Sequence, residues 1–554
     1  MVRPIDLLRQ GRKNELWLMC CGFVDLSLDQ FMAIQNRLLL EQLELLKASR
    51  IGSRVMRGAM PNTVEGFRKE VPLTTYSDYC PELQERREYV LPSKPIRWIR
   101  TSGYSGTYDI KWVPWSGRFE AELEKALAAC ALFAISRHRG DTSKVREHMK
   151  VLYTVGGPEY ASGAAGELTR RAFNFDFLPS NAEGLSFTDR IKVAFAQALD
   201  EGLDAFGGLP SVLAVVGDQM REQPKKPDIG FLVAHPRAAL RLVKGLSRSR
   251  VAGRPMLPRD IWDLKVILGG GTDSAVFKKK VEQMWGRRPL EMYGGTEGGI
   301  YATQTWDYNS LTFVPNLNFL EFVPEDEHLK WQLDHSYNPK TVLLDEVKSN
   351  QNYELIITNF HGGTLARFRI GDMIRIVSLR NEETRINLPQ MIFHSRADYL
   401  IDIAGLGRLT ERIIWEALEN TGVPYVEWTA RKEVLGDRAV LHLYVEPRYV
   451  NGIAERDIVK SFSRELQKLE KQYHHNPYNI YDSDAETESE ARSRQVEVTL
   501  LRQGAFADYI AQRQSEGADL GHLKPPHINP ADKTLAALMP QPSPKPGETA
   551  KLPR

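Results

Sequence analysis

A stretch of glycine and hydroxyl side chains at residues 101–107 is the first feature that could do chemistry. It follows residues 96–100, which we expect to form a short buried strand. Glycine lets the backbone approach an anion and point its N–H groups inward, and serine and threonine hydroxyls add donors. The stretch therefore predicts a phosphate cradle, with a plain connecting loop as an equal alternative. The residues are Thr101, Ser102, Gly103, Tyr104, Ser105, Gly106 and Thr107.

Two later glycine-rich stretches, residues 269–272 and 294–299, each follow an apolar run that predicts a strand. Helices are predicted between the strands, at residues 116–136 and 277–285, so strands alternate with helices along the chain. This alternation indicates an α/β domain, in which ligands collect beyond the carboxyl ends of the strands. All three glycine-rich stretches fit that location.

The alternation gives way to successive strands after residue 311, and a second domain is predicted from about residue 395. We therefore expect an α/β fold: a large multi-layer α/β N-terminal domain with a β subdomain, followed by a small α+β C-terminal domain. The expected boundaries are residues 1–394 for the large domain, 395–539 for the small domain and 540–554 for a disordered, Pro/Lys-rich tail.

Several local patterns carry further expectations. Apolar spacing predicts a helix over residues 27–46. Residues 156–163 are expected to be a flexible turn, and residues 482–490 an exposed acidic insertion. The basic residues within 237–254 are interpreted as a solvated helix face in preference to a nucleic-acid site. The stripe predicted for the first helix consists of Leu28, Phe31, Met32, Gln35, Leu38, Leu39, Gln42 and Leu45.

Composition limits the class of protein. The 554 residues include 73 Lys+Arg and 71 Asp+Glu, and the net charge of +2 gives no argument for nucleic acid or an anionic membrane as the main partner. The four cysteines lack the spacing of a metal site or a disulfide framework. Residues 16–24 are far too short to span a bilayer. We expect a reduced, cytoplasmic protein without a signal peptide or a membrane span.

Four stretches, in this order along the chain, resemble the adenylate-forming superfamily of acyl-CoA synthetases, adenylation domains and luciferases. More closely, they resemble the auxin-responsive (Gretchen Hagen) acyl-acid amido synthetase family. The stretches are residues 101–107, 293–299, 369–372 and 521–527. The resemblance extends over nearly the whole chain, from the N-terminal helix to Lys524.

The resemblance implies how a nucleotide would be held. In the resembled families a carboxylate attacks the α-phosphate of ATP and pyrophosphate leaves, so cations and N–H donors must offset the charge of two anions. The first glycine-rich loop would hold the triphosphate, Tyr293 would lie against the adenine, and the backbone of Gly270 and Gly271 would line the adenine pocket. The nucleotide-binding residues implied are Thr101, Ser102, Gly103, Ser105, Gly106, Gly270, Gly271, Tyr293, Gly294, Arg369 and Asp372.

Three residues would carry the chemistry. Glu297 would bind Mg²⁺, because a hard cation on phosphate oxygens prefers carboxylate ligands, and Thr296 would contact the α-phosphate. The alternative for Glu297 is an acid at a helix N-terminus, stabilised by the helix dipole. Lys524 would enter the site during adenylation, and its alternative is an ordinary exposed lysine.

Other charged residues have implied roles that leave two readings open. Asp372 would accept hydrogen bonds from both ribose hydroxyls, or it is an ordinary turn aspartate. Arg369 would bridge to phosphate or brace the hinge. Lys111 would assist the phosphate loop or be solvent-exposed. Arg396 and Asp398 would mark the hinge to the small domain or form a surface ion pair.

The function that we expect is an ATP- and Mg²⁺-dependent ligase, which activates a carboxylic acid as an acyl-adenylate and transfers the acyl group to an amine. One alternative acceptor is a thiol, from coenzyme A as a co-substrate or from a carrier protein. The alternative of another class is an inactive nucleotide or acyl binder. No nucleic-acid partner is expected, and the turn at residues 156–163 is a candidate lining for the acid pocket.

Overall fold

In the computed structural model, the described residues are 2–101, 110–153, 157–180, 187–222, 229–269, 274–396, 400–403, 407–435, 438–449, 454–473, 495–515, 527–530 and 532–539. The chain divides into two compact units, Met1–Ala397 and Asp398–Arg554. We refer to them as the N-terminal unit and the C-terminal unit.

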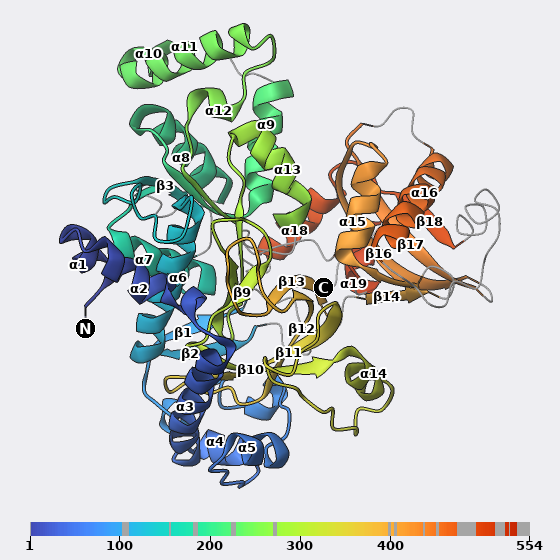
Figure 1. The fold of residues 1–554 in the computed structure, drawn as a ribbon. Coiled ribbons are helices and arrows are strands. Elements are labelled where there is room, and N and C mark those ends of the chain that lie inside the picture. Colours follow the sequence, from blue (N-terminus) through green and yellow to red (C-terminus); the bar gives the residue numbers. More distant parts are fainter. Residues whose placement is uncertain are drawn as a thin grey trace, which may run out of the picture. The chain divides into compact units, whose positions relative to one another are not determined.

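An eleven-stranded mixed sheet organises the N-terminal unit (Figure 1), in the order β10-β11-β12-β13-β9-β8-β7-β6-β5-β3-β4. Strands β4, β3, β5, β6 and β7 pair in parallel, and from β7 to β10 every pairing is antiparallel. The bounds are β3 Lys150–Tyr153, β4 Asp176–Leu178, β5 Ala205–Gly208, β6 Val266–Gly269, β7 Leu290–Gly295, β8 Gly299–Gln304, β9 Leu311–Phe313, β10 Asn318–Pro324, β11 Gln351–Asn359, β12 Phe368–Ser378 and β13 Gln390–Arg396. The expected α/β class is confirmed, and the strands after residue 311 form the antiparallel half of this one sheet.

Helices cover both faces of the parallel half of the sheet. The alternation of side chains along a strand places Val151 and Leu152 on opposite faces. Val151 packs with residues of α6 and α7, and Leu152 packs with residues of α8, α9 and α13. The helices are α1 Pro4–Arg9, α2 Lys13–Cys21, α3 Leu28–Lys47, α4 Arg50–Val55, α5 Val64–Glu70, α6 Gly117–Ile135, α7 Ala161–Phe173, α8 Phe187–Glu201, α9 Pro210–Glu222, α10 Ile229–Ala234, α11 Pro236–Val251, α12 Pro258–Ile261, α13 Ser274–Trp285 and α14 Glu325–Leu333, with single turns of 3-10 helix at Gly22–Asp25, Tyr76–Tyr79 and Glu88–Val90.

The first long helix of the N-terminal unit, α3, confirms the predicted helix and corrects its buried stripe. It begins after Ser27, whose hydroxyl accepts from the Gln30 backbone while the Gln30 side chain accepts from the Ser27 backbone. Leu45 is exposed, so its place in the predicted stripe is wrong. Leu43 and Leu46 are buried instead, because they continue the row of residues that faces the sheet.

Two other local expectations need correction. The strand expected at residues 96–100 is β1 (Pro95–Arg100), which pairs with β2 (Trp112–Ser116) in a separate two-stranded hairpin. It is only partly buried, since Ile99 is buried and Ile96 is exposed. Residues 161–163 form the first turn of α7, so only the residues before them can belong to the predicted flexible turn.

A three-stranded sheet forms the centre of the C-terminal unit, with β17 antiparallel to β16 and parallel to β18. Its elements are β14 Leu400–Ile403, β15 Gly407–Thr410, α15 Glu411–Asn420, β16 Tyr425–Leu435, β17 Arg438–Pro447, α16 Glu455–Tyr473, β18 Val496–Leu500, α18 Ala505–Ser515 and α19 Asp532–Leu538. The α+β character expected for this part of the chain is confirmed. The predicted acidic insertion and the predicted tail lie outside the described residues.

The described helices were also compared with the length and composition of a membrane span. No single one of them is long and apolar enough to cross a bilayer. One pair of helical segments, Lys13–Asp25 and Leu28–Lys47, has the length and composition of a membrane span only when the two are counted together, and the pair is bent by 103°.

Candidate active site

The glycine-rich stretch at residues 294–299 forms a tight turn between β7 and β8, which are antiparallel. A side chain at Gly294 would not fit, because its Cβ would lie 2.2 Å from the carbonyl oxygen of Gly299. Gly299 has a φ of +71°, which glycine adopts without steric cost. Because a strand follows the turn, Glu297 does not stand at a helix N-terminus, and that alternative is excluded.

Three side chains hold the backbone of this turn from outside it. The indole of Trp115 donates to the carbonyl of Thr296 at 3.3 Å. The side-chain amide of Asn359 donates to the carbonyl of Glu297 at 2.8 Å, and that of Asn318 donates to the carbonyl of Gly298 at 2.7 Å. The three donors come from β2, β11 and β10, so distant strands fix one turn.

The side chains of Thr296 and Glu297 take no part in the bonds that hold this turn. Thr296 and Glu297 are both partly exposed. Within the described residues, neither the Thr296 hydroxyl nor the Glu297 carboxylate has a hydrogen-bond or ion-pair partner. A carboxylate held on a fixed backbone and not neutralised by the described part of the chain is suited to bind a cation.

The predicted adenine residue and the predicted ribose residue lie together. The hydroxyl of Tyr293, in β7, donates to Oδ2 of Asp372 in β12 at 2.8 Å, and each residue is only 8% exposed. The Tyr293 ring also contacts Tyr301 and Phe393, with centroid distances of 5.1 Å and 5.8 Å. Since Gly294 follows Tyr293 directly, the pair adjoins the turn that carries Glu297.

The hairpin of β1 and β2, whose strands flank the predicted phosphate loop in the sequence, contacts the same turn. Thr101 and Lys111 close the loop: the Thr101 amide donates to the Lys111 carbonyl at 2.9 Å, and the Lys111 amide donates to Oγ1 of Thr101 at 3.1 Å. The Lys111 ammonium lies 5.8 Å from the ring centroid of Tyr76. Because Trp115 belongs to β2 and bonds the Thr296 carbonyl, the hairpin is attached to the Glu297 turn.

Comparison with protein families identifies two segments of the chain. The GH3 family N-terminal domain matches residues 22–183, and the GH3 family central domain matches residues 311–396. The chain thus contains two segments that match GH3 family domains. The central-domain match contains Asp372, and the N-terminal match contains the predicted phosphate loop.

Known GH3 proteins and several solved structures resemble this chain to different extents. A jasmonoyl–L-amino acid synthetase, JAR4 of Nicotiana attenuata, is 28% identical over 205 residues, which are 35% of this chain and 33% of the relative. The alignment thus spans about a third of that relative's length. The acyl acid amido synthetase AtGH3.15, solved with 2,4-DB, has a TM-score of 0.62 at 15% identity, covering 94% of this chain and 95% of its own. A 2-hydroxyisobutyryl-CoA ligase, solved in a postadenylation state, has a TM-score of 0.57 at 15% identity, covering 92% and 91%. The two structures show a shared fold.

Several of the predicted site residues lie outside the part of the chain that the structure describes. Their roles therefore stay predictions. They are Ser102, Gly103, Ser105, Gly106, Gly270, Gly271, Asp398 and Lys524. Strand β6, which ends at Gly269, pairs with β7, so the chain enters the stretch at residue 270 from a strand beside the one that carries Tyr293.

Arg369 is held by side chains of its own unit. Its guanidinium donates to both carboxylate oxygens of Glu354, at 2.9 Å and 2.5 Å, and lies 3.5 Å from the ring centroid of Trp331. His328 bonds the same carboxylate at 2.7 Å. Burial by itself raises the pKa of Glu354, but the hydrogen bonds from His328 and Arg369 outweigh it and lower the pKa. This geometry fixes the Arg369 guanidinium against β11 and α14, and its predicted roles at a phosphate or at the hinge both stay predictions.

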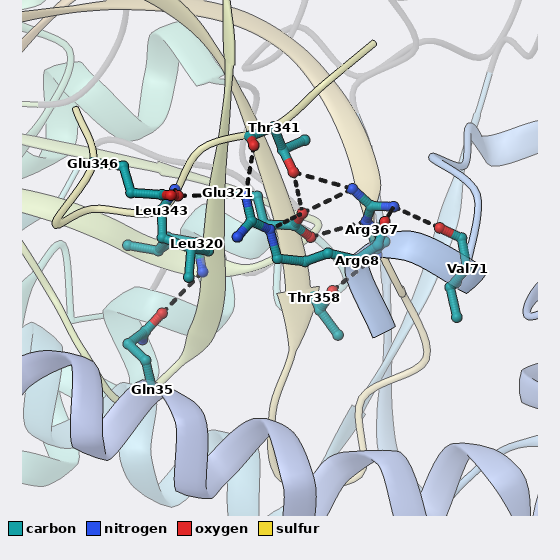
Figure 2. A network of polar contacts seen from close by, with 10 residues as sticks. All are labelled: Gln35, Arg68, Val71, Leu320, Glu321, Thr341, Leu343, Glu346, Thr358 and Arg367. Carbon is teal, nitrogen blue, oxygen red and sulfur yellow. Dashed lines mark hydrogen bonds and ion pairs between the residues drawn. The ribbon is translucent and has the colours of Figure 1, made fainter. Parts of the chain in front are cut away.

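The guanidinium of Arg367 makes all of its hydrogen bonds within a buried network (Figure 2). Its guanidinium donates to the two carboxylate oxygens of Glu321, at 3.1 Å and 2.8 Å, and to Thr341 at 3.2 Å. The remaining donors reach the carbonyls of Arg68 and Val71, at 2.6 Å and 2.5 Å. All five N–H groups are satisfied, so Arg367 ties the N-terminal helices to the sheet and is not available to a ligand.

Sequence reasoning missed the residues that support the site. Trp115, Asn318 and Asn359 hold the turn, and Phe393 packs against Tyr293. No motif contains them. The available signal was the position of two polar side chains at strand ends: Asn318 begins β10 and Asn359 ends β11.

Proposed function

We propose that this GH3 protein is an ATP- and Mg²⁺-dependent ligase that activates a carboxylic acid as an acyl-adenylate and transfers the acyl group to an amine. The observation that carries the proposal is the contact of Tyr293 with Asp372 beside the turn that presents Glu297. In a chain of this family, that arrangement supports a nucleotide site at the meeting point of the two halves of the sheet. Four free thiols are consistent with the reduced, cytoplasmic location that we also propose.

Asp372 is proposed to accept hydrogen bonds from the ribose hydroxyls. The Tyr293 hydroxyl already donates to Oδ2, which fixes the orientation of the carboxylate. The Tyr293 ring is proposed to lie against the adenine, which suits a flat aromatic face. The residues Gly270, Gly271 and Gly294 are proposed to line the same pocket.

Glu297 is proposed to hold Mg²⁺. The described residues contain no group of three or more His, Cys, Asp or Glu that could hold a metal alone. Mg²⁺ is commonly bound by one or two carboxylates together with substrate phosphates, so one unneutralised carboxylate on a fixed turn fits such a site. When bound, the ion would offset the charge of the phosphate oxygens.

The reaction would proceed in two steps. The acid carboxylate attacks the α-phosphorus of ATP, an O–P bond forms, and pyrophosphate leaves with the pair of electrons of the broken P–O bond. The amine then attacks the acyl carbonyl, loses a proton and displaces AMP. Thr296, Thr101, Ser102, Gly103, Ser105 and Gly106 are proposed as donors to the phosphates, and Lys524 as the cation that stabilises the charge developing during adenylation.

The amine acceptor is supported by the relatives rather than by the geometry. JAR4 is named as a jasmonoyl–L-amino acid synthetase, which points to the amino group of an amino acid. A 2-hydroxyisobutyryl-CoA ligase has the same fold, so a thioester formed with coenzyme A is the second candidate. An inactive binder would retain ATP affinity without turnover.

The direct test measures pyrophosphate release from the full chain with ATP, Mg²⁺ and a panel of carboxylic acids, each with amino acids or with coenzyme A. Mass spectrometry then separates an amide from a thioester. We expect release that depends on the acid, and an amide product. A thioester alone would favour the second candidate, and ATP binding without release for any acid would favour the inactive binder.

Lys524→Ala separates the two half-reactions. Removing one donor that stabilises transition-state charge costs about 2.7–4 kcal/mol, roughly a hundredfold to a thousandfold in rate. We expect that loss in acid-dependent pyrophosphate release and near-normal transfer from synthetic acyl-AMP to the amine. Equal losses in both steps would indicate a structural lysine.

A further inference from the structure

Residues 229–259 have an unusual charge distribution. They contain seven cations, Arg237, Arg241, Lys244, Arg248, Arg250, Arg254 and Arg259, and no Asp or Glu. The rest of the chain balances them, since the net charge is only +2. Whole-chain charge therefore conceals a strongly cationic segment, which folds as α10, α11 and the start of α12.

Helix α11 packs through one narrow side only. Ala238, Gly245 and Ser249 are its buried residues, and they are small, so the helix lies close against its neighbours. Figure 1 shows α10 and α11 at one end of the N-terminal unit, opposite α4 and α5, with nothing drawn beyond them. The rest of α11 consequently faces outward.

The outward side of α11 carries large aliphatic side chains as well as cations. Leu240 is 70% exposed, Val243 60% and Val251 91%. Lys244 and Arg250 are exposed between them. At 3.6 residues per turn, these five residues fall within about 120° of the helix circumference. The sequence pattern alone indicates a solvated basic helix, but the structure places aliphatic residues on the solvent side.

The outward cations are not neutralised by the fold. Arg254 forms an ion pair with Asp260 at 2.7 Å, and Arg241 donates to the carbonyl of Leu199 at 2.7 Å. Within the described residues, no carboxylate pairs with Arg237, Lys244 or Arg250. The exposed face therefore offers positive charge to an external anion.

We propose that the outward face of α11 docks on an anionic membrane surface, with its aliphatic residues at the level of the headgroups. Interleaved cations and aliphatic side chains on one face of a helix are the pattern of helices that lie in the membrane interface. The face is carried by a single helix at the edge of the unit, which suits a broad surface. A nucleic acid would use the cations and leave Leu240 and Val243 without a role, because aliphatic residues do not stack on bases.

The test uses the full chain and sedimentation with vesicles of phosphatidylcholine alone or with about one-third phosphatidylserine. We expect binding only to the phosphatidylserine vesicles, weakened by salt because surface charge is screened. Each cation near an anionic surface contributes about a fivefold change in partitioning, so Arg237→Gln/Lys244→Gln/Arg250→Gln should reduce binding roughly a hundredfold.

A second variant, Leu240→Ser/Val243→Ser, tests the aliphatic part and should also reduce binding at least tenfold. Matched controls are Leu18→Ser and Arg137→Gln, an exposed leucine and an exposed arginine on other helices or loops, which should bind like the wild type. All variants alter exposed side chains, and circular dichroism checks that they fold.

Three outcomes would overturn the proposal. The first is no binding of the folded protein to phosphatidylserine vesicles at low salt. The second is wild-type binding by Leu240→Ser/Val243→Ser, which would leave only a polyanion site. The third is tighter binding to a duplex oligonucleotide than to the vesicles, which would assign the face to nucleic acid.

Discussion

The hydroxyl of Tyr293 donates a 2.8 Å hydrogen bond to the carboxylate of Asp372, although 79 positions of the chain separate the two residues. Tyr293 lies in β7, the last strand that pairs in parallel, and Asp372 lies in the antiparallel half of the sheet. The bond therefore joins the two halves where the proposed nucleotide would lie. It also holds the Asp372 carboxylate in one orientation before any ligand binds.

Asp372→Ala is expected to weaken ATP binding. A hydrogen bond to a charged group contributes about 1.5–3 kcal/mol, so the Kd for ATP should rise on the order of tenfold or more. Tyr293→Phe should have a smaller effect, because it removes only the bond that orients the carboxylate. Calorimetric titration with ATP gives the measurement, and Asp326→Ala, an exposed aspartate in α14, is the matched control. An unchanged Kd in folded Asp372→Ala would remove this residue from the site.

Glu297→Gln is expected to raise the Mg²⁺ concentration needed for half-maximal pyrophosphate release and to lower the maximal rate. A neutral amide is a poorer ligand than a carboxylate for a hard cation. The measurement is a Mg²⁺ titration of the rate at saturating ATP. Glu382→Gln removes an exposed carboxylate elsewhere in the unit and should leave the titration unchanged. A Glu297→Gln titration that overlays the wild type would show that the assignment is wrong.

Asn359→Ala tests whether the turn must be held in place. The buried amide bonds the Glu297 carbonyl, the Asn318 side chain and the Leu365 amide. Leaving such buried groups unsatisfied costs about 1–3 kcal/mol, so the midpoint of urea unfolding should fall. We also expect the Mg²⁺ requirement to rise, as in Glu297→Gln. A destabilised variant with a wild-type Mg²⁺ titration would show that the Asn359 bond contributes to stability but is not needed for Mg²⁺ binding.

Arg367→Met is expected to destabilise the protein without changing the ATP affinity of the molecules that remain folded. The substitution leaves the buried carboxylate of Glu321 without its principal cation, and breaking a buried ion pair in this way costs about 3–5 kcal/mol. Adding Glu321→Gln should restore part of the stability. A tenfold change in the Kd for ATP would instead place Arg367 in the nucleotide site.

His527 in the C-terminal unit predicts a pH dependence of stability. Its ring nitrogens lie 2.6 Å from a carboxylate oxygen of Glu411 and 2.8 Å from one of Glu427, and its ring stacks on Trp428 with a centroid distance of 4.5 Å. Two carboxylate acceptors require both nitrogens to carry hydrogen, which is the imidazolium form. Burial by itself lowers the pKa of His527, but the carboxylates of Glu427 and Glu411 outweigh it and raise the pKa from 6.5 to about 9.

A pKa that is raised on folding adds stability that is complete below the unfolded value and is lost as pH rises through the folded value. The difference in unfolding free energy between the wild type and His527→Ala should therefore be full at pH 6 and decline between pH 7 and 10. The linked change is on the order of 3 kcal/mol, at 1.36 kcal/mol for each pKa unit. Urea unfolding at each pH gives the measurement, with His138→Ala, an exposed histidine, as the control. A difference that stays constant from pH 6 to 10 would mean that His527 is neutral in the fold.

The sequence by itself determined the order and type of most elements, because they depend on short-range periodicity and on caps. The helix after Ser27 and the helix after Ser116 begin at side chains that accept from the third residue along, and both were predicted within a residue or two. The sequence also supplied Tyr293, Glu297 and Asp372 as candidates, since glycine and acidic residues in those stretches resemble a known family.

Only the tertiary structure decided how those candidates meet. Tyr293 and Asp372, which share a hydrogen bond, come from separate strands. Asn318 and Asn359, which bond the backbone of the Glu297 turn, also come from other strands, and no local sequence pattern encodes such pairings. The exposure of Leu45 was missed for the same kind of reason, because a helix's inner side is set by what it packs against. Helical and strand periods act over a few residues, whereas the register of the eleven-stranded sheet depends on pairings between residues as distant in the chain as Thr312 and Gln390.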